Sequence, residues 1–138
     1  MVIEFQVLGE PKAQMRHRTF KKGDFTGAYD PSKAIKKDFL LTVQDKAPKE
    51  PLTGPIGLTV IFYMPRPKGH YRTGKNASML RDDAPEYHIS RPDIDNFCKL
   101  VFDALNGIFW KDDSQICHLF AQKMYSEQPR TYILIQTL

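Results

Sequence analysis

The chain has 138 residues, of which 41% are hydrophobic and 26% are charged, as is typical of a soluble globular protein. This length predicts one domain, residues 1–138, with an ordinary core. No apolar run approaches the roughly 20 residues of a membrane span, and the N-terminus lacks the basic leader of a signal peptide. We therefore expect a cytoplasmic protein with no membrane partner. The net charge of +4 is compatible with a nucleic-acid partner but does not establish one.

The cysteines and histidines form no recognisable metal-binding motif. Cys98 and Cys117 lack metal-ligand spacing, and we expect both to be buried thiols. The 4 histidines also lack ligand spacing, so none is expected to be catalytic. The candidate metal ligands are therefore carboxylates.

The N-terminal part of the chain predicts a strand followed by a basic segment. Apolar residues alternate with polar ones over residues 2–8, which predicts a strand. Residues 12–20 are basic and are interpreted as extended. Residues 21–24 are interpreted as a turn.

A helix, a buried strand and a long loop are expected next. Asp30 is interpreted as a helix N-cap with Pro31 in the first helical position, and the helix should end near Ala47. Residues 56–64 are rich in β-branched and aromatic types and predict a buried strand. Residues 65–92 lack periodicity, which indicates a functional or mobile loop.

The C-terminal part predicts a helix and further strands. Apolar residues at helical spacing predict a helix over residues 92–106, ended by Gly107. Residues 108–110 are interpreted as a short strand, and residues 115–125 and 130–137 as an antiparallel pair. The element order β-α-β-loop-α-β-β predicts an α/β (α+β) fold, a two-layer sandwich of a mixed sheet and about two helices.

Residues with reactive side chains gather at the start of the helix over residues 92–106. Asp93 and Asp95 are separated by one residue, and Lys99 lies one helical turn further on. In a structural interpretation, Asp93 caps the helix and Asp95 pairs with Lys99 on a solvated face. In a catalytic interpretation the carboxylates hold Mg²⁺, which prefers carboxylate oxygens together with substrate phosphate. An aspartyl phosphatase is disfavoured because a polar stretch, and not a hydrophobic strand, precedes the pair.

A second acidic pair, Asp112 and Asp113, favours the metal interpretation. It follows the helix closely, so the chain can fold back and bring a third carboxylate near Asp93 and Asp95. A cluster of like charges is costly unless a cation occupies it. An acidic cluster within a basic protein is the pattern expected of a metal-dependent nuclease.

Lys99 and two basic stretches fit the same chemistry. Lys99 either pairs with Asp95 or Asp103, or stabilises negative charge at a scissile phosphate. Positive charge concentrates in residues 12–22 and 66–81, where side chains are expected to contact DNA phosphates. The residues predicted to bind DNA are Lys12, Arg16, Arg18, Lys68, Arg72 and Lys75.

The aromatic residues are given mainly structural roles. Phe20, Phe25 and Tyr29 are interpreted as packing or dimer contacts rather than as platforms for stacked bases. Trp110 is expected in the core, where it would hold the acidic turn against the helix. Tyr71 fits either a mobile loop or a contact with an exposed base.

Three segments, residues 91–99, 102–107 and 110–116, closely resemble the RusA family of Holliday junction resolvases, which are found in bacteria and their prophages. The segment from Gly9 to Arg18 also resembles the N-terminal strand and basic segment of that family. The resemblance covers most of the chain and is most specific in the C-terminal half.

The resemblance implies a Mg²⁺-dependent homodimeric endonuclease, with Mn²⁺ as a substitute, that makes paired nicks in four-way DNA junctions during recombination and repair. Asp93, Asp95 and Asp113 match the essential acidic residues of the family and are the implied metal ligands, with Asp112 as the alternative third ligand. Lys99 matches its essential lysine. The implied partners are junction DNA and a second copy of the chain, whose two-fold symmetry suits two matched cuts. No small-molecule substrate is implied.

Two other functions fit the same residues. A non-catalytic module for branched DNA would keep the basic stretches and use the acidic pairs only as caps and turns. A nuclease for flaps or other branched DNA would use the same metal chemistry, because that chemistry serves any phosphodiester.

Overall fold

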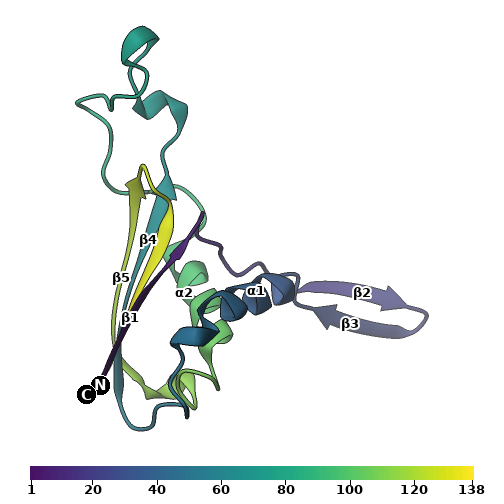
Figure 1. The fold of residues 1–138 in the computed structure, drawn as a ribbon. Helices are drawn as coiled ribbons and strands as arrows, with labels where there is room; N and C mark the ends of the chain where they lie inside the picture. The colour runs from purple at the N-terminus through teal and green to yellow at the C-terminus, as the bar shows by residue number, and fades with distance from the viewer.

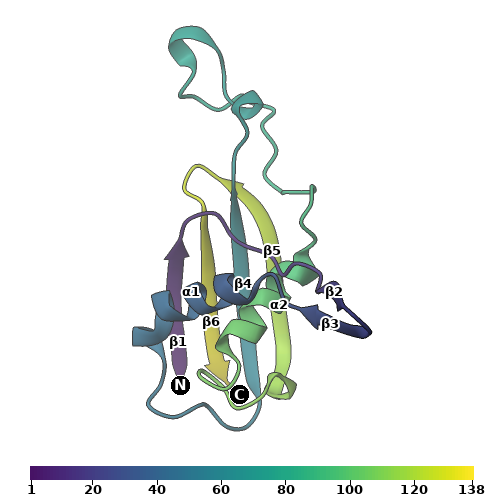
Figure 2. The ribbon, with the colours of Figure 1, turned by 90° about the vertical axis from the view of Figure 1, so that its right-hand side faces the viewer.

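The computed structural model describes residues 1–138 as a mixed sheet with two helices on one face (Figure 1). The elements in chain order are β1 (Val2–Leu8), β2 (Arg18–Lys22), β3 (Phe25–Tyr29), α1 (Lys33–Val43), β4 (Ile56–Pro65), α2 (Ile94–Leu105), β5 (Ile116–Ser126) and β6 (Arg130–Thr137). The sheet and the helices form two layers (Figure 2), which confirms the two-layer α+β prediction. Neither helix is long and apolar enough to cross a membrane.

The four strands of the sheet lie in the order β1-β6-β4-β5. β4 pairs antiparallel with β6 on one side and parallel with β5 on the other. The predicted pairing of residues 115–125 with 130–137 is therefore wrong, although both segments are strands. β4 is buried at alternate positions along its whole length, and such a strand is most stable in the middle of a sheet, where both of its edges are hydrogen-bonded.

The core lies between β4 and α2. Alternate residues of β4 are at most 5% exposed, namely Ile56, Leu58, Val60, Phe62 and Met64. Phe97 of α2 stacks on Phe62 with 4.9 Å between ring centroids. Leu100 and Ala104 are also buried, because α2 packs against α1 as well as against the sheet. The apolar stripe that predicts this helix does not include them and consists of Ile94, Phe97, Cys98, Val101, Phe102 and Leu105.

Two segments project from this body (Figure 1, Figure 2). The first is a hairpin of β2 and β3. The turn predicted at residues 21–24 is shorter in the structure: Lys21 and Lys22 belong to β2, and only residues 23–24 join the strands. The sequence did not indicate the second strand, because Gly27 weakens its β signal. The second is the segment between β4 and α2, which has no strand or α-helix, as predicted for residues 65–92.

α1 begins at Lys33, two residues later than predicted, with Ser32 as its N-cap residue. Asp30 is therefore not the helix cap. One oxygen of Asp30 accepts a hydrogen bond from the Ser32 backbone N–H at 2.8 Å, and the other contacts the Lys36 ammonium at 2.6 Å. The carboxylate thus closes the turn that precedes the helix.

Two further local predictions are wrong. Residues 108–110 form no strand, because Trp110 makes only isolated bridges to Leu52 and Asn106. Cys117 is exposed, because it lies on β5 at the open edge of the sheet. Cys98 is buried as expected, and burial together with the nearby charge of Asp95 raises the pKa of its thiol to about 11.

Candidate active site

The first turns of α2 carry Asp93, Asp95 and Lys99 on the exposed side of the helix. Asp93 is the N-cap residue, yet its side chain makes no capping hydrogen bond. Asp95 accepts a hydrogen bond from the Asn96 backbone N–H at 3.0 Å. No ion pair joins Asp95 to Lys99. These three side chains therefore form neither the cap nor the ion pair of the structural interpretation.

The two carboxylates of the later acidic pair, Asp112 and Asp113, make different contacts. Asp112 caps a short 3-10 turn: it accepts a hydrogen bond from the Ser114 N–H at 3.0 Å, and Gln115 reaches back to the Asp112 N–H at 2.8 Å. Asp113 instead accepts a hydrogen bond from the Trp110 indole N–H at 2.8 Å. Trp110 is fully buried, so it does hold the acidic turn against the core, as expected from the sequence.

The surroundings of Asp113 raise its pKa. Burial is the main cause, and the charges of Asp103 and Asp112 act in the same direction. The hydrogen bond from Trp110 opposes this shift because it favours the ionised form. A carboxylate with these neighbours binds either a proton or a cation more readily than an exposed one does.

Trp110→Phe is expected to raise the pKa of Asp113 further, because the substitution removes the N–H that stabilises the carboxylate. Titration of the side-chain carboxyl carbon by NMR in metal-free protein measures this directly. The same titration of Asp24, which is exposed in the hairpin turn, serves as the control. An unchanged or lowered pKa of Asp113 would show that the indole hydrogen bond does not control its ionisation.

A hollow of about 480 Å³ between α2 and β5 brings Asp95, Lys99 and Asp113 to one place. Its full lining is Ile94, Asp95, Cys98, Lys99, Phe102, Asp103, Asp113, Leu119 and Ala121. Three carboxylates thus share the hollow with the Lys99 ammonium group, and none of them holds it in an ion pair; Asp103 pairs with Lys36 instead. The hollow is open to solvent, and apolar side chains make up much of its wall.

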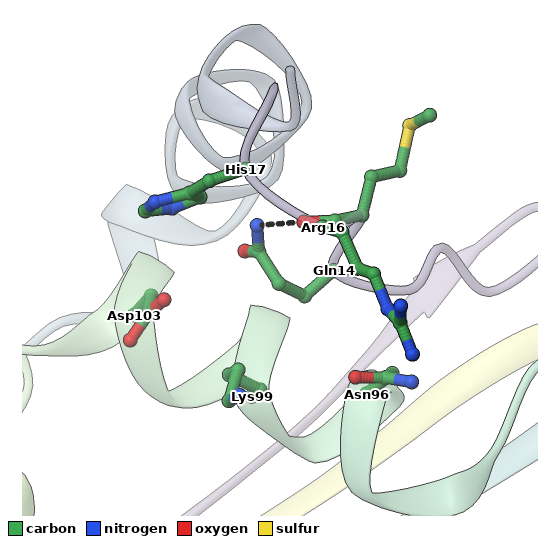
Figure 3. A pocket seen from close by; sticks show the side chains of 7 residues that line it. Gln14, Arg16, His17, Asn96, Lys99 and Asp103 are labelled. Carbon is green, nitrogen blue, oxygen red and sulfur yellow. Dashed lines mark hydrogen bonds between the residues drawn. The ribbon is translucent and has the colours of Figure 1, made fainter. Parts of the chain in front are cut away.

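Lys99 also lines a second hollow, of about 370 Å³, on the other side of α2 (Figure 3). Its wall opposite α2 is the basic segment that precedes the hairpin, from Gln14 to His17. In Figure 3 the guanidinium group of Arg16 lies beside Asn96. Arg16, predicted to bind DNA, is therefore brought next to the helix face that carries Lys99.

Hydrogen bonds fix this basic segment to both helices. The Gln14 backbone N–H donates to the carbonyl of Asn96 at 2.9 Å, and the Met15 N–H donates to Ser32 Oγ at 2.8 Å. The Gln14 amide also donates to Asp30 at 2.8 Å. The sequence did not predict these contacts, since they join residues distant in the chain.

Lys36 connects the same segment to α2 by contacting Asp30 at 2.6 Å and Asp103 at 3.0 Å. Burial alone would lower the pKa of Lys36, but its hydrogen bonds to the two carboxylates raise it. The hydrogen bond from Lys36 is the main reason that the pKa of Asp30 falls to about 2. Asp103 is therefore the partner of Lys36 and not of Lys99.

Lys36→Met is expected to destabilise the fold by about 1 kcal/mol at pH 7, since it removes partly exposed ion pairs. The pKa of Asp30 is depressed, so its contribution is present above pH 4 and is lost as the pH falls toward 2. The difference from wild type should shrink over that interval in urea unfolding experiments. Lys37→Met, on the exposed side of α1, is the matched control. A difference that stays constant down to pH 2 would contradict the role of Asp30.

The three predicted metal ligands are not gathered into one cluster. No group of three His, Cys, Asp or Glu side chains is arranged to hold a metal ion. Asp95 and Asp113 share the hollow beside β5, whereas Asp93 lines a neighbouring one with Lys12, Arg16 and other residues. The ligand set Asp93, Asp95 and Asp113 remains a prediction.

The other predicted DNA contacts lie in the two projections. Arg18 is the first residue of β2. Lys68 and Lys75 are exposed in the projection that follows β4. Arg72 contacts Asp82 at 3.0 Å and donates to the Leu80 carbonyl, so it also holds that projection together.

Comparison with known proteins gives two matches over most of the chain. The family described as endodeoxyribonuclease RusA matches residues 9–136. A relative from Bacillus subtilis (strain 168), described as an uncharacterized protein YqaN, is 35% identical over 139 residues. That match covers 97% of this chain and 95% of the relative.

Proposed function

We propose that this chain, which belongs to the endodeoxyribonuclease RusA family, is a Mg²⁺-dependent endonuclease that resolves four-way DNA junctions by paired nicks in recombination and repair. The observation that carries the proposal is the hollow between α2 and β5, where Lys99 lies with Asp95 and Asp113. None of these three charged groups takes part in an ion pair. All three therefore remain available to a metal ion and a phosphate.

The donor atoms of this hollow suit Mg²⁺. Asp95 and Asp113 offer only oxygen, and one or two protein carboxylates together with phosphate oxygens and water are its usual ligands. Mn²⁺ accepts the same donors. When bound, such an ion supplies an activated water and neutralises charge on the phosphate. We propose Asp93 as the further ligand and prefer Asp113 to Asp112, because the turn already uses the Asp112 carboxylate.

The side chains around the hollow would bind and orient the DNA backbone. Lys99 would place its ammonium group beside the scissile phosphate and stabilise the charge that develops there. Arg16, across the second hollow, would hold a neighbouring phosphate. The apolar side chains of Phe102 and Leu119 line the hollow between α2 and β5, beside Lys99.

Selectivity for four-way junctions would come from a homodimer. A junction has approximate two-fold symmetry, and a symmetric pair of chains presents two identical sites to it. Cleavage of a four-way junction, a flap and a linear duplex of matched sequence, each with Mg²⁺, tests this selectivity. We expect the junction to be cut fastest. Equal rates on the junction and the flap would assign the chain to branched DNA in general.

Calorimetric titration of the protein with Mn²⁺ separates an enzyme from a non-catalytic binding module. We expect binding that weakens strongly when Asp95 is replaced by asparagine. Absence of binding, or binding unaffected by that replacement, would favour a module that uses its carboxylates only as caps and turns.

A further inference from the structure

The β2–β3 hairpin gathers its aromatic residues on one face. In the antiparallel register Arg18 lies opposite Tyr29, Phe20 opposite Gly27, and Lys22 opposite Phe25. Residues directly opposite each other in a two-stranded sheet share a face. One face therefore carries three aromatic rings and two cationic side chains. The opposite face carries Thr19, Lys21, Thr26 and Ala28.

The three rings form a cluster that is open to solvent. Phe20 lies 6.1 Å from Phe25 and 6.5 Å from Tyr29, measured between ring centroids. Phe20, Phe25 and Tyr29 remain 44%, 64% and 47% exposed. A Cβ at Gly27 would meet the Phe20 ring at 2.5 Å, so glycine at this position lets that ring lie flat across the hairpin. Of the two roles expected from the sequence, packing is limited to contacts among the three rings themselves, and a dimer contact stays a prediction.

The charges on this face favour a nucleic acid as the occupant. Neither Arg18 nor Lys22 takes part in an ion pair. Exposed aromatic rings between free cations are the combination that binds unpaired nucleotides, because bases stack on the rings while the cations contact the phosphates. A second copy of the chain fits poorly, because a symmetric contact would bring the cations of the two copies together.

The hairpin is held at its base in a fixed relation to Lys99. The segment leading into it lines the hollow beside Lys99, and Asp30, directly after it, binds Lys36, which also binds Asp103 of α2. The five residues of β2 span roughly 15 Å at the rise of a strand. That length matches about four stacked nucleotides at 3.4 Å each. Figure 1 and Figure 2 show the hairpin extending beyond the helices, clear of the sheet.

We propose that the face formed by Phe20, Phe25 and Tyr29 stacks on unpaired bases at the branch point of the DNA substrate. This inference rests on the proposed function only in taking branched DNA as the partner. Base stacking by the hairpin requires neither a metal ion nor cleavage. It would orient the branch point relative to the helix that carries Lys99.

Binding measured in EDTA tests the inference separately from catalysis. The double variant Phe25→Leu, Tyr29→Leu is expected to bind a four-way junction roughly tenfold more weakly, with unchanged affinity for linear duplex. The slope of log affinity against log salt should not change, because no phosphate contact is lost. A 2-aminopurine at the branch point should be quenched by the wild-type protein and stay bright with the double variant.

Two matched variants guard against effects on folding. Phe25→Tyr combined with Tyr29→Phe keeps both rings and should bind like wild type. Thr26→Ala, on the opposite face, should do the same. Leucine retains apolar packing but has no ring. If only the leucine variant loses affinity for the junction, the lost affinity is therefore due to base stacking. The inference is overturned if the leucine variant loses affinity equally for junction and duplex, or loses none. It is also overturned if the leucine variant dissociates into monomers in sedimentation, because this face would then be a contact between copies.

The outcomes also separate this inference from the proposed function. A wild-type protein that cuts no DNA with Mg²⁺, but whose junction affinity depends on the two rings, would contradict the proposed enzyme and support the hairpin's role. A protein that cuts junctions, but whose leucine variant binds them normally, would overturn the hairpin's role alone.

Discussion

Asp95→Asn is expected to reduce junction cleavage by more than about a hundredfold and to leave junction binding unchanged or tighter. Loss of a residue that merely orients a metal ligand costs about 10- to 100-fold, so loss of a ligand itself should cost more. Asp95 makes no ion pair and lines the hollow with Lys99, so its removal leaves no buried charge unpaired. Binding is preserved or tightened because one negative charge near the phosphates is lost. Single-turnover cleavage and a binding titration without metal measure the two effects.

Asp83→Asn is the matched control for this variant. Asp83 is also an exposed aspartate, but it lies in the projection after β4 and contacts only Arg81, at 3.2 Å. We expect it to cut like wild type. If Asp95→Asn lost binding together with cleavage, or cut as well as Asp83→Asn, the assignment of Asp95 as a metal ligand would be wrong.

Lys99→Met should lower cleavage by about 10²- to 10³-fold, the usual cost of removing one group that stabilises charge in a transition state. Lys99 is exposed and has no ion-pair partner, so the folded state should lose less than about 0.5 kcal/mol. Metal binding should persist, because the two proposed ligands in the hollow, Asp95 and Asp113, remain. Cleavage kinetics, urea unfolding and Mn²⁺ calorimetry on one preparation separate these effects.

Lys49→Met provides the comparison for the lysine variant, because Lys49 is an exposed lysine in the segment between α1 and β4. It should match wild type in cleavage, stability and metal binding. Equal cleavage by Lys99→Met and Lys49→Met would remove Lys99 from the reaction. If Lys99→Met lowers cleavage only because the variant unfolds, Lys99 has a structural role instead.

The features that the sequence predicted correctly depend on short-range periodicity. Alternation over residues 2–8 located β1, the β-branched and aromatic residues over 56–64 located β4, and helical spacing located α2 to within two residues. The fold class followed from the order of these elements. The predicted pairing of β5 with β6 was wrong. Both segments are recognisable as strands from their own residues, but no local pattern shows that β4 lies between them in the sheet.

The candidate site was predictable as a set of residue types but not as an arrangement. Asp112 and Asp113 are adjacent residues of the same type, and only their contacts distinguish them. Asp113 accepts a hydrogen bond from the Trp110 indole, whereas Asp112 caps the short turn. The link from Lys36 to Asp30 and Asp103 joins positions far apart in the chain, and no spacing pattern reports it. Of the residues in this link, Asp30 is given a structural role by the sequence pattern, but as a helix cap.

The hairpin shows the same limit. Its turn was predicted, but Gly27 concealed the second strand, and without that strand the three aromatic residues could not be assigned to one face. The register of the strands supplies that information. It shows that Phe20, Phe25 and Tyr29, interpreted from the sequence as packing or dimer contacts, form an exposed surface on the single chain.

Cleavage of a supercoiled plasmid that extrudes a cruciform, with Mg²⁺ present, tests the central claim most directly. Paired nicks across the four-way junction yield linear DNA, whereas single nicks yield open circles. We expect linear product from the wild-type protein, no product in EDTA and almost none from Asp95→Asn. Failure to cut the plasmid with either Mg²⁺ or Mn²⁺, or equal cutting of a plasmid without the cruciform, would contradict the account.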